Sequence, residues 1–131
     1  MIRFLDFVSA AGNNQITEWY CRQPVDCRVM FDDLLDILAK KAEWGYPEFK
    51  NLGNGLGEIR WKFGKVQHRI VGCDWKSPPG YLLLMGCTHK QEIYSPPGAI
   101  DTADKRRRGL LFERKGSVRE HTSPEDCAPT Q

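Results

Sequence analysis

The sequence lacks a long apolar run. Its longest, Tyr81–Met85, suits one buried strand and falls far short of the roughly 20 residues that a membrane-spanning helix needs. The first eight residues, Met-Ile-Arg-Phe-Leu-Asp-Phe-Val, are too few and too interrupted by charge for a signal peptide. We therefore expect a cytoplasmic protein that is not exported and does not enter a membrane.

The sequence also lacks a close pair of cysteines. Structural zinc sites usually show two tight ligand pairs, and none of the 5 cysteines forms a C-x-x-C motif. A zinc site from Cys73, Cys87, His68 and His89 is conceivable, but each cysteine and its nearest histidine lie on an extended segment. We expect no metal and no cofactor. We expect reduced thiols instead, mostly packed as small apolar residues.

Positive charge is unevenly distributed. The net charge is only +2, yet residues 57–112 hold 10 Lys and Arg against 5 Asp and Glu. Residues 1–56 hold 6 against 8, and residues 113–131 hold 3 against 4. Basic charge gathered in one segment favours a polyanionic partner such as nucleic acid, although such runs are often only solvated surfaces.

The first half of the chain predicts one strand, two helices and a loop. Ile2–Ser9 has the composition of a strand, and a preceding asparagine can cap a short helix over Gln15–Arg22. Over Val25–Glu43 apolar residues recur at spacings of three and four, which indicates an amphipathic helix. Pro47 and four glycines make Gly45–Gly57 a predicted mobile loop.

The second half predicts a hairpin, a central strand and a last helix. Glu58–Phe63 alternates strictly, with apolar residues on one side and Glu58, Arg60 and Lys62 on the other. The further predicted segments are a second strand at Val66–Asp74, a turn at Trp75–Gly80, a central strand at Tyr81–Cys87, an irregular connection at Thr88–Gly98 and a helix at Ala99–Phe112.

This order predicts one α+β domain over residues 1–112. An N-terminal strand and two helices are followed by an antiparallel sheet and a C-terminal helix, in two layers. The helices cover one face and leave the other partly open, with Arg60 and Lys62 pointing into the open face. Residues 113–131 show no apolar periodicity and are predicted to form a flexible C-terminal tail.

Several short motifs follow one another along the chain in a recognisable order. Glu-Ile-Arg at 58–60 precedes Arg-Ile-Val at 69–71, and an apolar strand then ends in Gly-Cys-Thr-His-Lys at 86–90. Ser-Pro at 95–96 and a basic helix at 103–108 come next, and Ile-Thr-Glu-Trp at 16–19 stands near the start. Together these motifs resemble the RelE/HigB-type toxins of type II toxin–antitoxin systems, especially the phage-derived HigB-like branch. The likeness covers about residues 1 to 110.

The resemblance implies a two-layer RelE-like fold and a ribosome-dependent mRNA endonuclease that works without metal. Its cellular partners would be mRNA on the ribosome and a cognate antitoxin, expected to be a small helix-turn-helix protein. In such a reaction the 2′-hydroxyl attacks the adjacent phosphate, which requires a base, an acid and cations around the phosphorane. Here His89-Lys90 stands where the family pattern has two lysines, and Cys87 stands where it has an aromatic residue.

The candidate catalytic residues are Arg69, His89, Arg60 and Lys90. Arg60 and Arg69 match basic positions of the family and would bind phosphate. The alternative for Arg60 is that it pairs with a carboxylate and braces the sheet. His89 is a candidate acid or base, or else a solvated loop histidine. The candidate RNA-binding residues are Lys62, Tyr94, Arg106, Arg107 and Arg108.

The sequence leaves alternative interpretations open for several of these residues and for the whole domain. Tyr94 could stack on a base or only pack beside its prolines, and Arg106–Arg108 could contact ribosomal RNA or only suit the C-terminal end of their helix. His68 neighbours Arg69 on its strand, so it is expected to face the helices. The whole scaffold could also be a non-catalytic RNA- or protein-binding module, or a phage accessory or structural protein.

Overall fold

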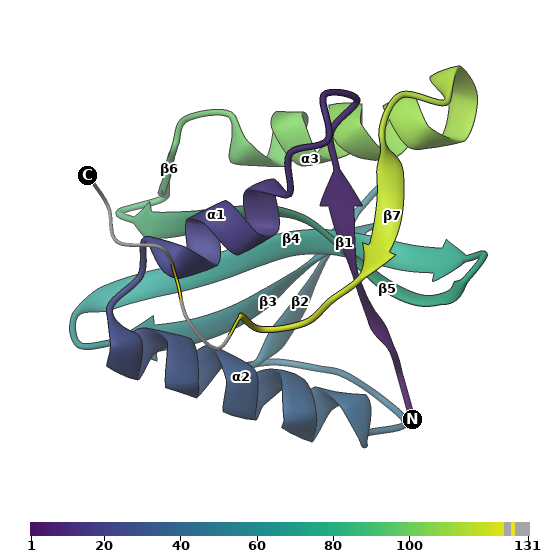
Figure 1. Cartoon of the computed structure of the whole chain (residues 1–131). Helices are drawn as coiled ribbons and strands as arrows, with labels where there is room; N and C mark the ends of the chain where they lie inside the picture. Colours follow the sequence, from purple (N-terminus) through teal and green to yellow (C-terminus); the bar gives the residue numbers. More distant parts are fainter. Residues whose placement is uncertain (125–126, 128–131) are drawn as a thin grey trace.

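The computed structural model, which describes residues 1–124 and 127, shows an α+β domain built on one mixed sheet (Figure 1). The elements, in chain order, are β1 (Phe4–Val8), α1 (Gln15–Cys21), α2 (Val25–Ala39), β2 (Phe49–Gly53), β3 (Leu56–Phe63), β4 (Val66–Lys76), β5 (Pro79–Lys90), β6 (Ile93–Ser95), α3 (Ala99–Arg108), the π-helical turn η1 (Gly109–Glu113) and β7 (Ser117–Glu120).

The seven strands follow the order β2-β3-β4-β5-β1-β7, and β6 pairs with β5 beside this path. The antiparallel pairing of β3, β4 and β5 is confirmed. β1 lies parallel to β5, however, so the sheet is mixed and not purely antiparallel. The chain between β1 and β5 runs through α1, α2, β2, β3 and β4, and this long connection satisfies the requirement of a parallel pair.

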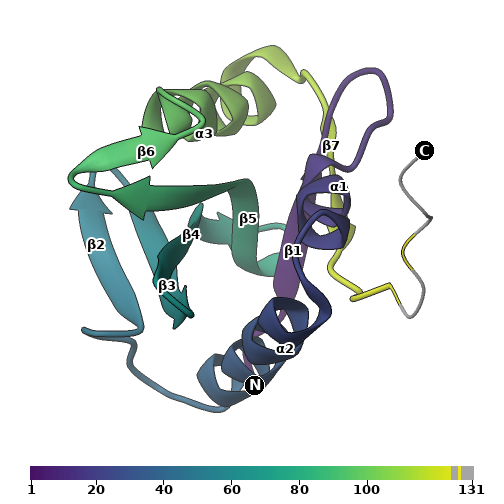
Figure 2. The same cartoon turned by 90° about the vertical axis from the view of Figure 1, so that its left-hand side faces the viewer.

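Helices pack on both faces of the sheet, so the prediction that the helices cover only one face, in two layers, is wrong. α1 and α2 pack on the face that bears Ile59, Trp61 and Ile70. α3 packs on the opposite face, where Ala99 and Ala103 are fully buried against apolar residues of β1, β4 and β5. Small residues on α3 let this helix approach closely, and the figures show it across the sheet from α1 and α2 (Figures 1 and 2).

The two first helices form where the sequence predicts them. Asn14 caps α1, since its side chain accepts a hydrogen bond from the backbone N–H of Thr17 at 3.0 Å. α1 then lays Trp19 on Gly86 of β5, where any Cβ would clash with the indole ring. α2 ends at Ala39, four residues before the predicted end at Glu43.

Three connecting segments are more regular than predicted. The expected mobile loop at Gly45–Gly57 contains β2 and a tight turn into β3, where Gly53 and Gly55 adopt positive φ. The expected turn at Trp75–Gly80 shrinks to two residues, and the irregular connection at Thr88–Gly98 contains the hairpin of β5 and β6. Long-range pairing supplies these strands with partners that local composition does not reveal.

The C-terminal segment is attached to the domain, so the prediction of a flexible tail is wrong for the described residues. β7 pairs antiparallel with the free edge of β1, and His121 Nδ1 lies 2.8 Å from the buried Asp6 carboxylate. Residues 125–126 and 128–131 of the predicted tail lie outside the described residues. An unpaired sheet edge is a liability, and β7 covers it here.

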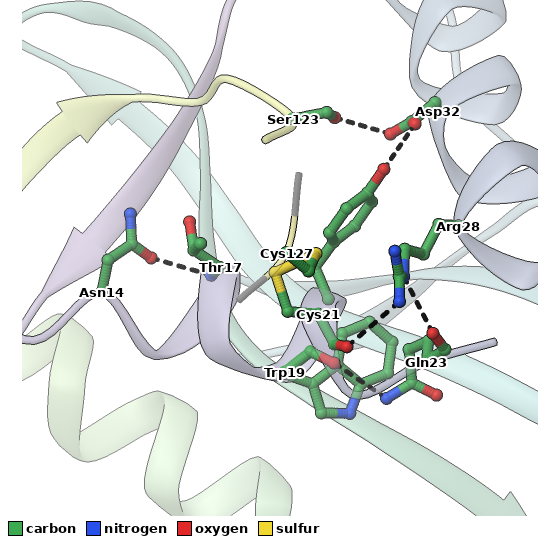
Figure 3. Close-up of a disulfide and its surroundings, with 10 residues drawn as sticks. Asn14, Thr17, Trp19, Cys21, Gln23, Arg28, Asp32, Ser123 and Cys127 are labelled. Atoms are coloured by element: carbon green, nitrogen blue, oxygen red, sulfur yellow. Dashed lines mark hydrogen bonds between the residues drawn. A yellow bond between two sulfur atoms is a disulfide. The ribbon is translucent and has the colours of Figure 1, made fainter. Parts of the chain in front are cut away.

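A disulfide between Cys21 at the end of α1 and Cys127 also holds this segment (Figure 3). The prediction of reduced thiols is therefore wrong for these two cysteines, because the fold brings residues 106 positions apart within 5.2 Å at their Cα atoms. Cys27, Cys73 and Cys87 are buried free thiols, as predicted. Nearby, Ser123 donates a hydrogen bond to Asp32, which also accepts one from Tyr20.

In the described part of the chain, no helix combines the length and the apolar composition that crossing a membrane requires.

Candidate functional site

The candidate residues of β3 to β6 gather on one face of the sheet. Cross-strand partners in an antiparallel sheet present their side chains to the same face. One row across the strands is Arg60, Arg69 and Cys87, and the next row is Lys62, Gln67, His89 and Tyr94. Register thus brings together residues that the sequence separates by up to 34 positions.

Glu58 is the centre of this face. Its side chain is 3% exposed, and its Oε1 lies 3.4 Å from Arg60 Nε and 3.6 Å from Arg69 Nε. Its Oε2 accepts a hydrogen bond of 2.8 Å from the Tyr94 hydroxyl. One carboxylate therefore serves two guanidiniums, and the Glu58–Arg60–Arg69 cluster keeps one net positive charge.

Tyr94 encloses Arg69 beneath it. Glu58 lies on β3 and Tyr94 on β6, so their hydrogen bond passes over β4 and β5, and the strong curvature of the sheet makes this span possible (Figure 2). Burial, and then the hydrogen bond to Glu58, raise the pKa of Tyr94, which keeps its hydroxyl a donor at neutral pH. Arg69 is left only 3% exposed.

Arg69 is therefore a buried cation. Its Nη1 donates to Gln67 Oε1 at 3.2 Å and to the His68 carbonyl at 3.0 Å. Burial, and then the charge of Arg60, lower the pKa of Arg69, although a guanidinium remains protonated at neutral pH. Arg69 also lines the groove beside Arg60, but with little of its surface exposed.

Arg60 is the more exposed of the two guanidiniums, with 17% of its side chain exposed against 4% for Arg69. It borders a groove of about 520 Å³ whose other walls include Tyr46, Lys62 and Gln67. Its guanidinium carbon lies 4.8 Å from the centre of the Tyr46 ring, a cation–π contact. Within the described residues, Arg60 Nε and Nη1 are buried and lack a hydrogen-bond acceptor. Such donors beside a groove suit an anionic ligand.

His89 and Lys90 lie at the end of β5, beside the β6 hairpin. The ring of His89 packs against that of Tyr94, with 4.6 Å between their centres. Lys90 and Lys62 are exposed. Because Tyr94 also donates to Glu58, this ring contact places His89 beside the Glu58–Arg60–Arg69 cluster. The imidazole is partly exposed, so it is accessible to a ligand bound over β3 and β4.

The three arginines of α3 lie outside this groove. Arg106 donates to the Leu84 carbonyl at 2.7 Å, and this carbonyl is free because a register shift between β4 and β5 leaves Leu84 unpaired. Arg107 pairs with Asp104 at 3.2 Å, and the more exposed Arg108 pairs with the same carboxylate at 3.4 Å. Arg106 is bound within the fold, and only Arg108 is well exposed on the surface.

The four residues of the conceivable zinc site are not brought together. His68 stacks on Trp61 on the side of α1 and α2, as expected, while Cys87 and His89 lie on the opposite face. Among the residues described, no three His, Cys, Asp or Glu side chains are placed to share a metal ion. Burial raises the pKa of Cys73 to about 11 and that of Cys87 to about 12, so both remain neutral thiols.

Sequence reasoning missed three members of the site. Glu58 shares the alternation of Arg60, which placed it on the correct face, but nothing marked it as the partner of both arginines. Gln67 has the same period on β4, two residues before Arg69. Tyr46 stood in a presumed mobile loop, and no local signal places its ring beside Arg60.

Comparisons with protein-family models, with curated proteins and with solved structures find no match to this chain. The resemblance to RelE/HigB-type toxins stays a prediction.

Proposed function

We propose that this chain binds single-stranded RNA along the groove beside Tyr46, Arg60 and Lys62 and cuts it without a metal ion. The observation that supports this proposal is the Glu58–Arg60–Arg69 cluster. Its net positive charge borders an open groove, and Arg60 Nε and Nη1 have no hydrogen-bond acceptor among the described residues. A phosphodiester offers negative charge and hydrogen-bond acceptors to such a guanidinium.

Binding would combine phosphate contacts with stacking. Arg60 and Lys62 would hold a backbone phosphate, and the 76% exposed ring of Tyr46 offers a flat surface for an unpaired base. Gln67, held by Arg69, lines the same groove.

Cutting would proceed by attack of the RNA 2′-hydroxyl on the neighbouring phosphorus, with the 5′-oxygen leaving. The products are a 2′,3′-cyclic phosphate and a 5′-hydroxyl. Arg60 would stabilise the charge of the phosphorane, with the buried charge of Arg69 behind it. His89 would act as the general acid or base on this face, and Lys90 adds positive charge beside it.

The biological setting that we propose follows the motif resemblance. The chain would be the toxin of a type II toxin–antitoxin pair, acting in the cytoplasm on mRNA bound to the ribosome. A small helix-turn-helix antitoxin would cover the same groove.

RNA binding is tested by fluorescence anisotropy with a labelled single-stranded RNA over a series of salt concentrations. Arg60→Ala should weaken binding about tenfold or more and lower the salt slope by about one, as expected for one lost phosphate contact. Arg119→Ala removes the same charge from exposed β7, at the other edge of the sheet, and should change little. Equal losses in both variants would mean that binding is not located in this groove.

Cleavage is tested by controlled induction followed by primer extension on translated mRNA. The proposal expects growth arrest and discrete new 5′ ends within ribosome-covered codons. His89→Ala alone should slow cleavage about 100-fold or more, the usual range for a general acid or base. The double variant His89→Ala, Arg69→Ala should relieve the arrest, and full toxicity in it would exclude these residues as the site.

A second candidate function is RNA binding without cleavage. The observation in its favour is the enclosure of Arg69, which is 3% exposed beneath the hydrogen bond between Tyr94 and Glu58. A non-cutting module would show the Arg60-dependent binding but no new 5′ ends after induction.

A further inference from the structure

A second and larger cavity of about 750 Å³ lies at the opposite end of β3 from Lys62, where β1 and β5 begin and β4 ends. Trp44, Phe49 and Tyr81 form its aromatic wall. These three rings meet edge to face, with centres 4.9 to 6.0 Å apart and planes inclined by 62° to 81°. Trp44 and Phe49 are only partly buried, so the aromatic wall of the cavity is accessible to a ligand.

The Tyr81 hydroxyl is an unsatisfied donor beside this cavity. Tyr81 is 4% exposed, and within the described residues its hydroxyl has no hydrogen-bond partner. The hydroxyl lies next to Gly57, itself a wall of the cavity, where an added Cβ would stand 2.9 Å from it. Burial strongly raises the pKa of Tyr81, so the group is a neutral O–H. A buried hydroxyl without a partner costs stability unless a ligand accepts from it.

The rim of the cavity supplies a hydrogen-bond acceptor. The exposed Asp74 carboxylate lines the cavity, and it takes part in no ion pair among the described residues. Arg3, the neighbouring cation of the rim, is bound instead to Glu120 at 2.8 Å. A ligand that spans the cavity therefore meets aromatic rings, the buried and unpartnered Tyr81 hydroxyl behind them and the Asp74 carboxylate at the rim.

We propose that this cavity binds a planar heteroaromatic ring that carries a hydrogen-bond acceptor and an exocyclic amino group, the chemistry of an amino-bearing nucleobase. The ring would pack on Trp44 and Phe49, its acceptor would take the Tyr81 O–H, and its amino group would donate to Asp74. This site is separate from the groove at Arg60 and stands whether or not the chain cuts RNA.

The test uses cytidine and uridine as probes, followed by NMR of the Trp indole N–H signals of the full chain. The two nucleosides have nearly the same shape, but cytidine carries an amino group where uridine carries a carbonyl. Cytidine should shift the Trp44 signal and bind more tightly than uridine. No shift with either nucleoside up to about 10 mM, the weak end of useful affinity, would overturn the proposal.

Two variants assign the contacts. Tyr81→Phe should weaken cytidine binding threefold to tenfold, the worth of one neutral hydrogen bond. It should leave the thermal unfolding temperature unchanged or higher, because it deletes an unsatisfied hydroxyl. Asp74→Asn should abolish the preference for cytidine over uridine, and Arg119→Ala serves as the surface control. Unchanged affinity in Tyr81→Phe together with an unchanged preference in Asp74→Asn would refute the site.

The base can come from a free nucleoside or from an RNA strand, and a short oligocytidine separates the two sources. Tighter binding of the oligonucleotide than of cytidine, lost in Tyr81→Phe, assigns the cavity to a base within RNA. Equal binding per base assigns it to a free ligand. The Trp44 signal reports on this cavity and primer extension reports on the Arg60 groove, so either proposal can fail without the other.

Discussion

Breaking the Cys21–Cys127 disulfide should lower the free energy of unfolding of this protein substantially. The bond joins the end of α1 to the C-terminal segment across 106 residues, so it closes most of the chain into one loop (Figure 3). Its removal enlarges the conformational freedom of the unfolded state. For a loop of that length, the chain-entropy relation gives a loss of about 4.8 kcal/mol in the free energy of unfolding, to be taken as an upper bound.

Other contacts of the same segment should persist after reduction. β7 still pairs with β1, and His121 still contacts the buried Asp6 carboxylate. Because these contacts do not depend on the sulfur bond, we expect the reduced protein to remain folded at 25 °C. If unfolding exposes a typical area for this size, with a urea slope of about 2 kcal/mol per M, the midpoint should fall by up to about 2.4 M.

The assay is urea unfolding followed by tryptophan fluorescence, with and without a phosphine reductant. The variants are Cys21→Ser, Cys127→Ser and the double variant, and all three should match the reduced wild type. Thiol titration of the unfolded protein should count three thiols before reduction and five after it. A reductant that exposes five thiols but leaves the midpoint unchanged would refute the entropic argument, and a reductant effect on the double variant would show that it acts elsewhere.

Three further predictions concern buried groups. Glu58→Gln leaves Arg69 as a buried cation without its counter-charge and should lower the free energy of unfolding by about 3 kcal/mol. Glu43→Gln, at an exposed position, should change it very little, and equal effects of the two variants in urea unfolding would contradict the central role of Glu58. Burial, the largest cause, lowers the pKa of His68, so below about pH 7 the unfolded chain binds more protons than the folded one and the free energy of unfolding should fall toward pH 5.5. His68→Gln should show a shallower fall with pH, and an unchanged slope would exclude His68 as its source. The raised pKa values of Cys73 and Cys87 predict that neither thiol reacts with iodoacetamide at about pH 8 in the native protein, and mass spectrometry that finds either one alkylated before unfolding would show that the fold opens there.

Local pattern was sufficient for the elements whose own residues carry the signal. The three-and-four spacing after Val25 predicted α2, and the alternation of Glu58–Phe63 predicted β3 and assigned each of its side chains to the correct face. The same alternation put Arg60 on the face where the structure shows the groove. The alternation of side chains along β4, where His68 adjoins Arg69, likewise turned His68 toward the helices, where it packs on Trp61. Periodicity determines these features because each depends only on neighbours a few residues away.

Pairing across the chain decided the remaining features. β2, β6 and β7 are short and polar, and they are strands because a partner strand lies beside each of them. The placement of α3 over the second face depends on packing that no local pattern encodes. The prediction of a flexible tail was wrong for this reason, since the contacts that hold it come from β1, α1 and α2.

The candidate site divides along the same line. The sequence by itself determined which basic residues β3, β4 and β5 carry and, through alternation, which face each of them occupies. Only the tertiary structure decided that Glu58 joins Arg60 to Arg69, that Tyr94 bonds to the same carboxylate, and that Arg60 is the more exposed of the two guanidiniums that line the groove. The physical reason is that side-chain type and periodicity are local, whereas burial and the sharing of one carboxylate depend on strand register and on the curvature of the sheet.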